Sequence, residues 1–306
     1  QVKYLVEKGH DVEIIAPLEQ SSDNNNALLL TDKLGVKVHL YNIGNRKVKL
    51  LAGLFRKQSL SVANFYSRQM QKGIDDLIET QVFDAVLCTA SSVAEYVFNS
   101  QSIQKKRERL TLLMDFMDLD SDKWRQYSLN SNPLMRWVYA REAVLLAAYE
   151  CKIHEYFNHC FFVSEQEVEL FSKQLTVENR ASAIGNGLDF SEFKPVSLAS
   201  KPEGCNLLFT GVMDYAPNVD AVVWFVEKVW PSILAVKPDA HFTIAGMRPT
   251  ARVQQLTEYQ GVEVTGFVED IMPYLNRAHI FVAPFRIARG VQNKVLQAFA
   301  CGLPTV

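Results

Sequence analysis

Short apolar runs alternate with longer stretches of helical periodicity along the whole chain. Such runs predict buried parallel strands, and the stretches between them predict the helices of βαβ units. The expected strands are 12–16, 36–43, 85–89, 110–114, 160–163, 206–210, 241–245, 262–265 and 280–283. The expected helices are 65–79, 93–99, 133–157, 166–173, 218–236, 251–259, 271–275 and 291–300. The pattern therefore predicts an α/β protein with parallel sheets.

A polar stretch with two prolines and a glycine, residues 195–204, interrupts this alternation and predicts a linker. The length of 306 residues also suits two domains of roughly 150 residues. We expect two Rossmann-like domains, residues 1–198 and 199–306, whose parallel sheets face each other across a cleft. The chain opens without Met in a helical stretch and stops in an extended run, so we expect a fragment that lacks a first strand and a C-terminal region.

Composition excludes several classes of protein. A net charge of −2 argues against a nucleic-acid partner. The apolar runs are far shorter than the ~20 residues that a membrane span requires. Five scattered cysteines without metal-ligand spacing are typical of a reducing compartment, so we expect a cytoplasmic protein.

The strongest candidate site lies in the last expected βα unit. A strand leads into Gly290 and then into a helix, and such a turn presents backbone N–H groups to phosphate. Arg286, Arg289 and Lys294 add positive charge, which suits a diphosphate. An ordinary βα unit with solvated basic residues remains the alternative. Gly211, at the end of an earlier strand, is expected at the same sheet edge, where α/β proteins bind ligands.

Seven motifs in order resemble the glycosyltransferases of family 4, in particular sugar transferases of exopolysaccharide and PEP-CTERM systems. They are DFMDLDSDKW (115–124), FFVSEQEVELF (161–171), NGLDFSEFKP (186–195), LLFTGVMDYAPNVDAVVWF (207–225), FTIAGMRP (242–249), VEVTGFVEDIMPYL (262–275) and KVLQAFACGLPTV (294–306). The resemblance implies a GT-B fold and a retaining transfer of sugar from a nucleoside-diphosphate sugar to a glycan or lipid-linked acceptor. No cofactor and no metal are expected.

The resemblance also implies donor-binding residues in the second domain: Gly211, Phe267, Arg286, Arg289, Gly290, Lys294 and Gln297. Two of them depart from the family, in which glutamates stand where this chain has Arg289 and Gln297. The loop after the first strand of this domain also lacks the family's basic residues, so Lys294 is expected to be the main phosphate ligand. The departures leave open a catalytically inactive GT-B module that binds a glycan or a protein partner.

Asp118 is the expected catalytic residue on the acceptor side of the first domain. It follows an expected strand, with Trp124 nearby to stack on a sugar ring. The alternative is a structural role, in which Asp120 or Ser121 caps a helix that carries Trp124 into the core. On the long helix 133–157, Glu150 and His154 are expected to form a structural pair.

A basic segment of the first domain is a candidate for membrane binding. Residues 33–74 hold nine Lys and Arg and no acidic residue, and 45–58 interleave these bases with Leu and Phe. Such a segment can bind an anionic membrane surface, here the inner face of the membrane, where a lipid-linked acceptor would lie. A solvated insertion near the acceptor is the alternative.

Overall fold

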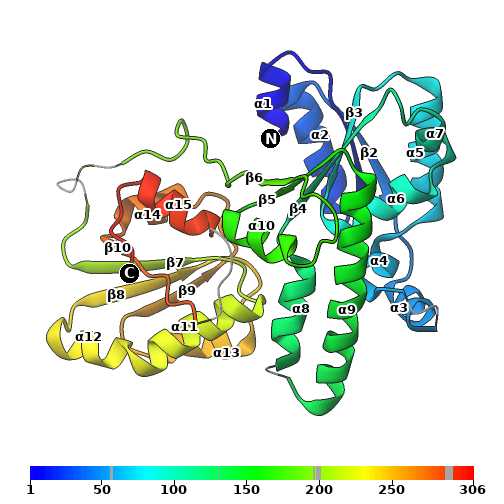
Figure 1. Ribbon diagram of the computed structural model, residues 1–306. Coiled ribbons are helices and arrows are strands. Elements are labelled where there is room, and N and C mark those ends of the chain that lie inside the picture. Colours follow the sequence, from blue (N-terminus) through cyan, green and yellow to red (C-terminus); the bar gives the residue numbers. More distant parts are fainter. Residues whose placement is uncertain (56–57, 130, 196, 198–200, 287–291) are drawn as a thin grey trace. The chain divides into compact units, whose positions relative to one another are not determined.

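The computed structural model describes residues 1–55, 58–129, 131–195, 197, 201–286 and 292–306. The chain forms two compact units, a first unit of Gln1–Ile184 and a second unit of Gly185–Val306 (Figure 1). This division falls before the expected boundary at 198/199, because Phe193 packs against the core of the second unit. The structure defines the fold of each of the two units separately.

The first unit contains two parallel sheets. A pair is formed by β1 (Glu13–Leu18) and β2 (Lys37–Asn42), and a four-stranded sheet has the order β3 (Ala85–Thr89), β4 (Thr111–Met117), β5 (His159–Phe162), β6 (Ala181–Ala183). The helices are α1 (Val2–Glu7), α2 (Ser22–Leu34), α3 (Arg46–Phe55), α4 (Leu60–Phe65), α5 (Arg68–Thr80), η1 (Ser91–Val93), α6 (Ala94–Asn99), α7 (Gln101–Lys105), α8 (Asp120–Leu129), α9 (Pro133–Tyr156) and α10 (Glu165–Ser172).

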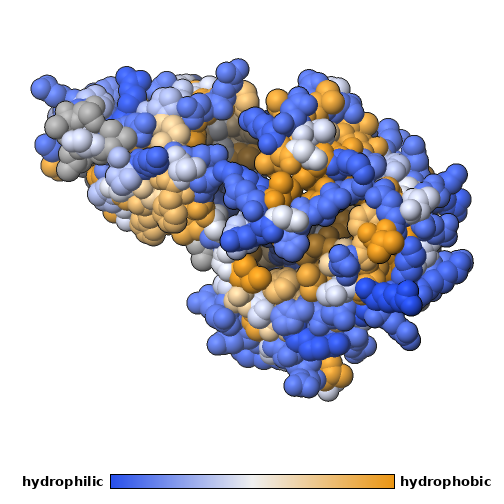
Figure 2. All heavy atoms as spheres, turned by 90° about the horizontal axis from the view of Figure 1, so that it is seen from above, coloured by the Kyte–Doolittle hydropathy of each residue, from blue (hydrophilic) through white to orange (hydrophobic). Residues whose placement is uncertain are grey.

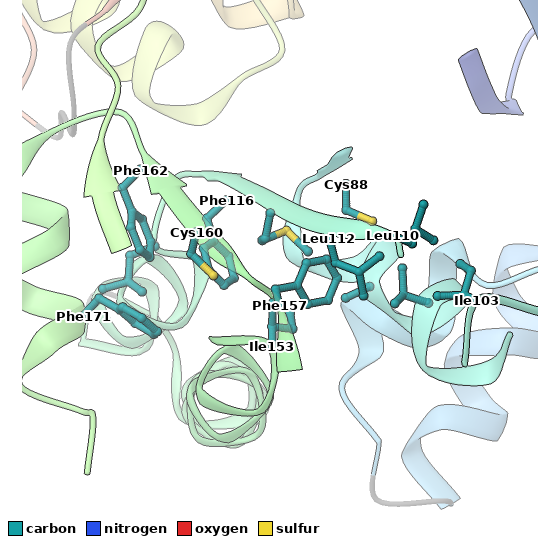
Figure 3. Packing of buried hydrophobic residues seen from close by; sticks show 14 of the residues in the cluster. Cys88, Ile103, Leu110, Leu112, Phe116, Ile153, Phe157, Cys160, Phe162 and Phe171 are labelled. Carbon is teal, nitrogen blue, oxygen red and sulfur yellow. The ribbon is translucent and has the colours of Figure 1, made fainter. Parts of the chain in front are cut away.

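The core of the first unit follows from the alternation along its central strand. Leu112, Met114 and Phe116 on β4 are buried, and the ring of Phe116 stacks on Phe162 of β5 at 4.8 Å (Figure 3). Ile153, Phe157 and Phe171 close this layer from the helix side. At the surface, Figure 2 shows polar atoms interspersed with apolar patches. In the described part of the chain, no helix has the length and apolar character needed to cross a bilayer.

Helix α9 carries buried carboxylates that cap other helices. Glu142 accepts hydrogen bonds from the N–H groups of Leu60 (2.9 Å) and Ser61 (2.8 Å), at the start of α4. Glu150 accepts from the N–H of Ser121 at 3.0 Å, at the start of α8. The expected pairing of Glu150 with His154 is therefore wrong, since His154 Nε2 instead accepts from the N–H of Arg180.

Glu150 makes the stability of the first unit depend on pH. Burial raises its pKa from 4.5 to about 8, and the hydrogen bonds of Ser121 oppose that rise only partly. A carboxyl whose pKa is raised on folding stabilises the fold below its unfolded pKa, and this contribution is lost as pH rises toward the folded pKa.

The wild-type protein should therefore lose unfolding free energy as the pH rises from about 4.5 to 8. We expect Glu150→Gln to remove this loss, because glutamine does not ionise. The loss of unfolding free energy is on the order of 1.4 kcal/mol for each unit by which the folded and unfolded pKa values differ. Denaturant unfolding of both proteins across this range measures the effect, and Glu155→Gln, at an exposed position on the same helix, is the matched control. Parallel pH profiles for wild type and Glu150→Gln would contradict the prediction.

The second unit is a parallel sheet in the order β10 (Ile280–Phe281), β7 (Cys205–Thr210), β8 (Ala240–Ala245), β9 (Val262–Gly266). A parallel bridge from Phe281 to Thr305 extends it beyond β10. The helices are α11 (Ala216–Lys228), α12 (Trp230–Val236), α13 (Ala251–Gln254), η3 (Gln255–Glu258), α14 (Met272–Arg277) and α15 (Asn293–Ala300). The chain runs from β7 outward to β9 and then returns to the other side of β7, so the strand order reverses between β7 and β10.

Helices cover both faces of this sheet, which explains its uninterrupted apolar strands. On β7, Leu207 and Phe209 face the cluster that contains the helix residues Val222 and Trp230, whereas Leu208 faces the cluster that contains Ala298. The α/β class with parallel sheets, expected from the sequence, is confirmed.

Two details of the expected elements differ. The single helix expected over 218–236 is broken at Val229, because Pro231 in the first turn of α12 has no N–H with which to continue α11. Strand β6 and helices α2, α3, α4 and α7 were not expected, and β10 is shorter than the predicted run.

Candidate functional site

The candidate site of the second unit lies at the C-terminal ends of β7 and β10. The strand order reverses there, and open α/β sheets bind ligands at such a reversal. Helix α11 begins shortly after β7, and α15 follows β10 along the chain. Within the described parts of the chain, neither helix has a side-chain cap or an acidic residue in its first turn. The positive ends of both helix dipoles are therefore not neutralised by their own residues, which favours an anion.

Lys294 lies in the first turn of α15, and its ammonium points toward β7. Nζ donates to Asn218 Oδ1 at 2.7 Å and lies 4.7 Å and 5.0 Å from the ring centres of Phe209 and Phe285. Burial lowers the pKa of Lys294 to about 8. No ion pair joins Lys294 to a carboxylate in the part of the chain that the structure describes. A partly desolvated cation without a counter-ion is a strong attractor for a negatively charged ligand.

Asn218 holds this lysine in place, a role that the sequence did not suggest. Its side chain is almost fully buried at 4% exposure. Nδ2 donates to the carbonyl of Val212 at 2.9 Å, which fixes the amide so that Oδ1 faces Lys294. A polar residue in the first turn of the helix after the β7 loop is the signal that could have identified it.

Glycines leave the space in which these groups meet. A Cβ on Gly211 would lie 2.8 Å from both Lys294 Nζ and Asn218 Nδ2. Gly246, after β8, has φ +153°, and a Cβ there would lie 1.6 Å from the carbonyl oxygen of Gly211. The backbones of two neighbouring loops thus approach each other as closely as glycine permits.

Arg286 does not add a second unpaired charge. Its guanidinium binds both carboxylate oxygens of Asp220 on α11, with Nε at 3.1 Å from Oδ2, and lies over the ring of Trp224 at 5.8 Å. This ion pair engages the guanidinium within the unit, and the role of Arg286 in donor binding stays a prediction. The expected ligands Arg289 and Gly290 lie outside the described residues.

Gln297 and Phe267 are placed at the same end of the unit. Gln297 follows Lys294 by one turn of α15, so the two share a helix face. Phe267 comes directly after β9 and is 67% exposed. Tyr215 and Met247, which the sequence did not single out, are also exposed apolar residues in the loops after β7 and β8. We call Tyr215, Met247 and Phe267 the apolar rim.

Asp118 in the first unit lies between the end of β4 and the start of α8, next to Met117 with φ +62°. Asp120 is engaged within the unit, since it pairs with Lys123 at 3.0 Å and accepts from Ser91 Oγ at 3.2 Å. Trp124 packs against Tyr139, with ring centres 5.2 Å apart. This packing favours the structural alternative for Trp124, whereas the role of Asp118 stays a prediction.

Comparison with known proteins identifies a family model, a relative and two solved structures that are similar to this chain. Residues 204–306 match the family model described as Glycosyl transferases group 1. An "uncharacterized 44.6 kDa protein in cps region" of Klebsiella pneumoniae is 21% identical over 309 residues, which cover 97% of this chain and 74% of that protein. Among solved structures, sucrose-phosphate synthase from Thermosynechococcus elongatus has a TM-score of 0.64 at 14% identity, over 99% of this chain and 72% of that chain.

Anabaena HepE, solved in complex with UDP and glucose, has a TM-score of 0.62 at 11% identity, over 99% of this chain and 74% of that chain. At these identities the structural likeness shows the fold. It confirms the GT-B fold class that the sequence motifs implied.

Proposed function

We propose that the chain, whose residues 204–306 match the group 1 glycosyltransferase model, transfers a sugar from a nucleoside-diphosphate sugar to a glycan or lipid-linked acceptor, with retention of configuration. The observation that carries this proposal is the partly buried ammonium of Lys294, which has no carboxylate partner among the described residues and lies at the N-termini of α11 and α15. In glycosyl transfer, charge develops on the departing diphosphate. Cations and N–H dipoles already in position stabilise that charge without reorganisation.

Each part of the site has a role in this proposal. Lys294, with the N-termini of α11 and α15, binds the diphosphate and supplies positive charge without a metal cofactor. Gln297 donates to or accepts from hydroxyls of the donor, and Phe267 borders the base. Arg286 binds the diphosphate only after its ion pair with Asp220 is broken. Arg289 and Gly290, which lie outside the described residues, stay predicted donor ligands.

The first unit receives the acceptor, with Asp118 orienting its hydroxyl. The relative from a cps region supports a role in polysaccharide biosynthesis, and the neighbour solved with UDP supports a nucleotide-sugar donor. We further propose that the protein is cytoplasmic and binds the inner face of the membrane through residues 45–58. Helix α3 in this segment exposes Val48, Leu54 and Phe55, which suits an anionic bilayer surface.

A catalytically inactive module is the second candidate. Arg289 and Gln297 replace the two glutamates of family 4, and this observation favours binding without turnover. Release of free sugar from a bound donor separates the two candidates, because an inactive module binds the donor and leaves it intact.

Thermal-shift screening against UDP-, GDP- and ADP-sugars tests the donor assignment, since a ligand that binds only the folded state raises the unfolding temperature. A shift with one nucleotide series, larger than the shift with the free sugar, is expected. No shift with any nucleotide sugar would overturn the proposed function.

Donor affinity should also depend on pH through Lys294. The free protein binds the diphosphate best with Lys294 protonated, and its pKa is about 8. Affinity should therefore be constant at neutral pH and fall above about pH 8, by up to tenfold per pH unit. A nucleotide sugar is the right ligand because its doubly esterified diphosphate keeps a constant charge in this range. Titration calorimetry at several pH values measures the profile, and Lys294→Ala should flatten it.

A further inference from the structure

A cavity in the first unit lies beside helix α3 and is lined in part by residues of the segment 45–58. Its volume is about 470 Å³, within the range of ~300–1,000 Å³ typical of ligand pockets. It opens at the C-terminal end of β2, between α3, α4 and the start of α5. Among the described residues of its wall, Lys49 and Arg68 are charged and none is acidic.

Lys49 turns inward from α3 toward this cavity. Nζ donates to the carbonyls of Tyr66 (2.5 Å) and Asn64 (3.3 Å). An ammonium has three N–H donors, so one remains for a ligand. Burial lowers the pKa of Lys49, and no ion pair with a described carboxylate balances its charge. The expectation that Lys49 faces a membrane with the other bases of 45–58 is therefore corrected.

The start of α5 supplies further donors to the same wall. Ser67, Arg68 and Gln69 line the cavity. The Ser67 hydroxyl donates to the carbonyl of Asn42 at 3.0 Å and does not cap the helix. The first turn of this 13-residue helix has no acidic residue. Lys49, Arg68 and the start of α5 thus line one space, and none of the described residues that line it is acidic.

We propose that this cavity binds a phosphate or diphosphate group of the acceptor, held by Lys49, Arg68 and the N–H groups at the start of α5. The term acceptor rests on the proposed function, whereas the anion site itself does not. An acceptor anchored here by its phosphate would leave its sugar hydroxyls outside the cavity. The exposed apolar residues of α3 would place a lipid tail on the same side of the unit.

Titration of pyrophosphate into the full chain tests the anion site. All variants carry Lys294→Ala, so that the cation of the second unit does not take up the probe. Lys49→Gln should lower the affinity by about tenfold or more, because it removes a charge-assisted hydrogen bond. Arg68→Gln should also lower it, and because Arg68 is exposed this variant keeps the packing of α3 on α4.

Lys47→Gln is the matched control, with the same loss of charge at an exposed position on the same helix. It should leave the affinity within about twofold of the parent, in line with the small energies of exposed charges. The site would be overturned if the parent protein, which carries Lys294→Ala alone, did not bind pyrophosphate. It would also be overturned if both Lys49→Gln and Arg68→Gln bound pyrophosphate as the parent does, or if Lys47→Gln lost as much affinity as they do.

Competition identifies the source of the phosphate. A soluble glycosyl phosphate and phosphatidylcholine vesicles that carry a polyprenyl diphosphate are each tested for displacement of pyrophosphate, with pure phosphatidylcholine vesicles as the blank. Displacement by either one supports an acceptor and names its class, and displacement by neither overturns the acceptor assignment. Donor binding is measured separately, with the wild-type protein. A failure of the proposed function would therefore appear in that assay and would leave the pyrophosphate affinities of the Lys49 variants unchanged.

Discussion

Replacement of Lys294 by alanine is expected to weaken nucleotide-sugar binding by about 1–3 kcal/mol, the energy of a lost charge-assisted hydrogen bond. The substitution removes the cation between the two helix N-termini and leaves both Phe209 and Phe285 facing an empty volume. Because the charge on the diphosphate grows as the donor bond breaks, the turnover number should fall further than the affinity. Calorimetry and initial-rate assays measure the two effects.

Lys228→Ala is the control for that experiment, since it removes an exposed lysine from α11 of the same unit. It should leave donor affinity unchanged. Loss of the Asn218 hydrogen bond in Lys294→Ala also costs stability, so unfolding of both variants is followed in parallel. Wild-type donor affinity in folded Lys294→Ala would contradict the assignment of the diphosphate site.

Replacement of Gly246 by alanine is expected to destabilise the second unit by roughly 3 kcal/mol or more, since it combines backbone strain with overpacking. The new Cβ would lie 1.6 Å from the carbonyl oxygen of Gly211, which is far inside contact distance, and φ at this position is +153°. One of the two loops must therefore move. Because Gly211 borders both Lys294 and Asn218, donor binding should be lost along with stability.

Hydrogen exchange of the β7 and β8 amides measures this effect within the second unit, where whole-chain unfolding would mix the two units. Gly187→Ala is the matched control, because no atom lies within 4 Å of the added Cβ and φ lies outside the left-handed region. It should change stability by less than about 0.5 kcal/mol. Exchange rates in Gly246→Ala equal to those of the control would refute the close approach of the two loops.

Most strands of both units could be predicted from the sequence because each contains a short apolar run, whereas the three-residue strand β6 was missed. Ala85–Thr89 is strand β3 as expected, and the runs that end at Thr210 and Ala245 end where β7 and β8 end. The helix over Ser22–Leu34 could not be predicted in the same way. It contains three asparagines and buries no residue, so its apolar pattern is weak, and its end is set by Gly35 in a left-handed conformation.

The candidate site, like the fold, was predictable from the sequence only in part. The sequence placed Lys294 and Gly211 at one sheet edge, because parallel strands bring their C-terminal ends together. It could not show that Arg286 pairs with Asp220 while Lys294 takes Asn218 as its partner. These partners lie 66 and 76 residues away in the chain, and which of two basic residues turns inward depends on packing between helices.

The apolar rim has a consequence for how such enzymes diversify. Tyr215, Met247 and Phe267 belong to three separate connections outside the hydrogen-bonded ladder, whereas the ladder below them is held by the buried Phe209 and Phe242. Under the proposed function, in which Phe267 borders the base, a substitution in one of these connections can therefore alter which nucleobase is preferred without weakening the framework. Donor preference would then change by single substitutions outside the ladder, while Lys294 and its partner Asn218 stay in place.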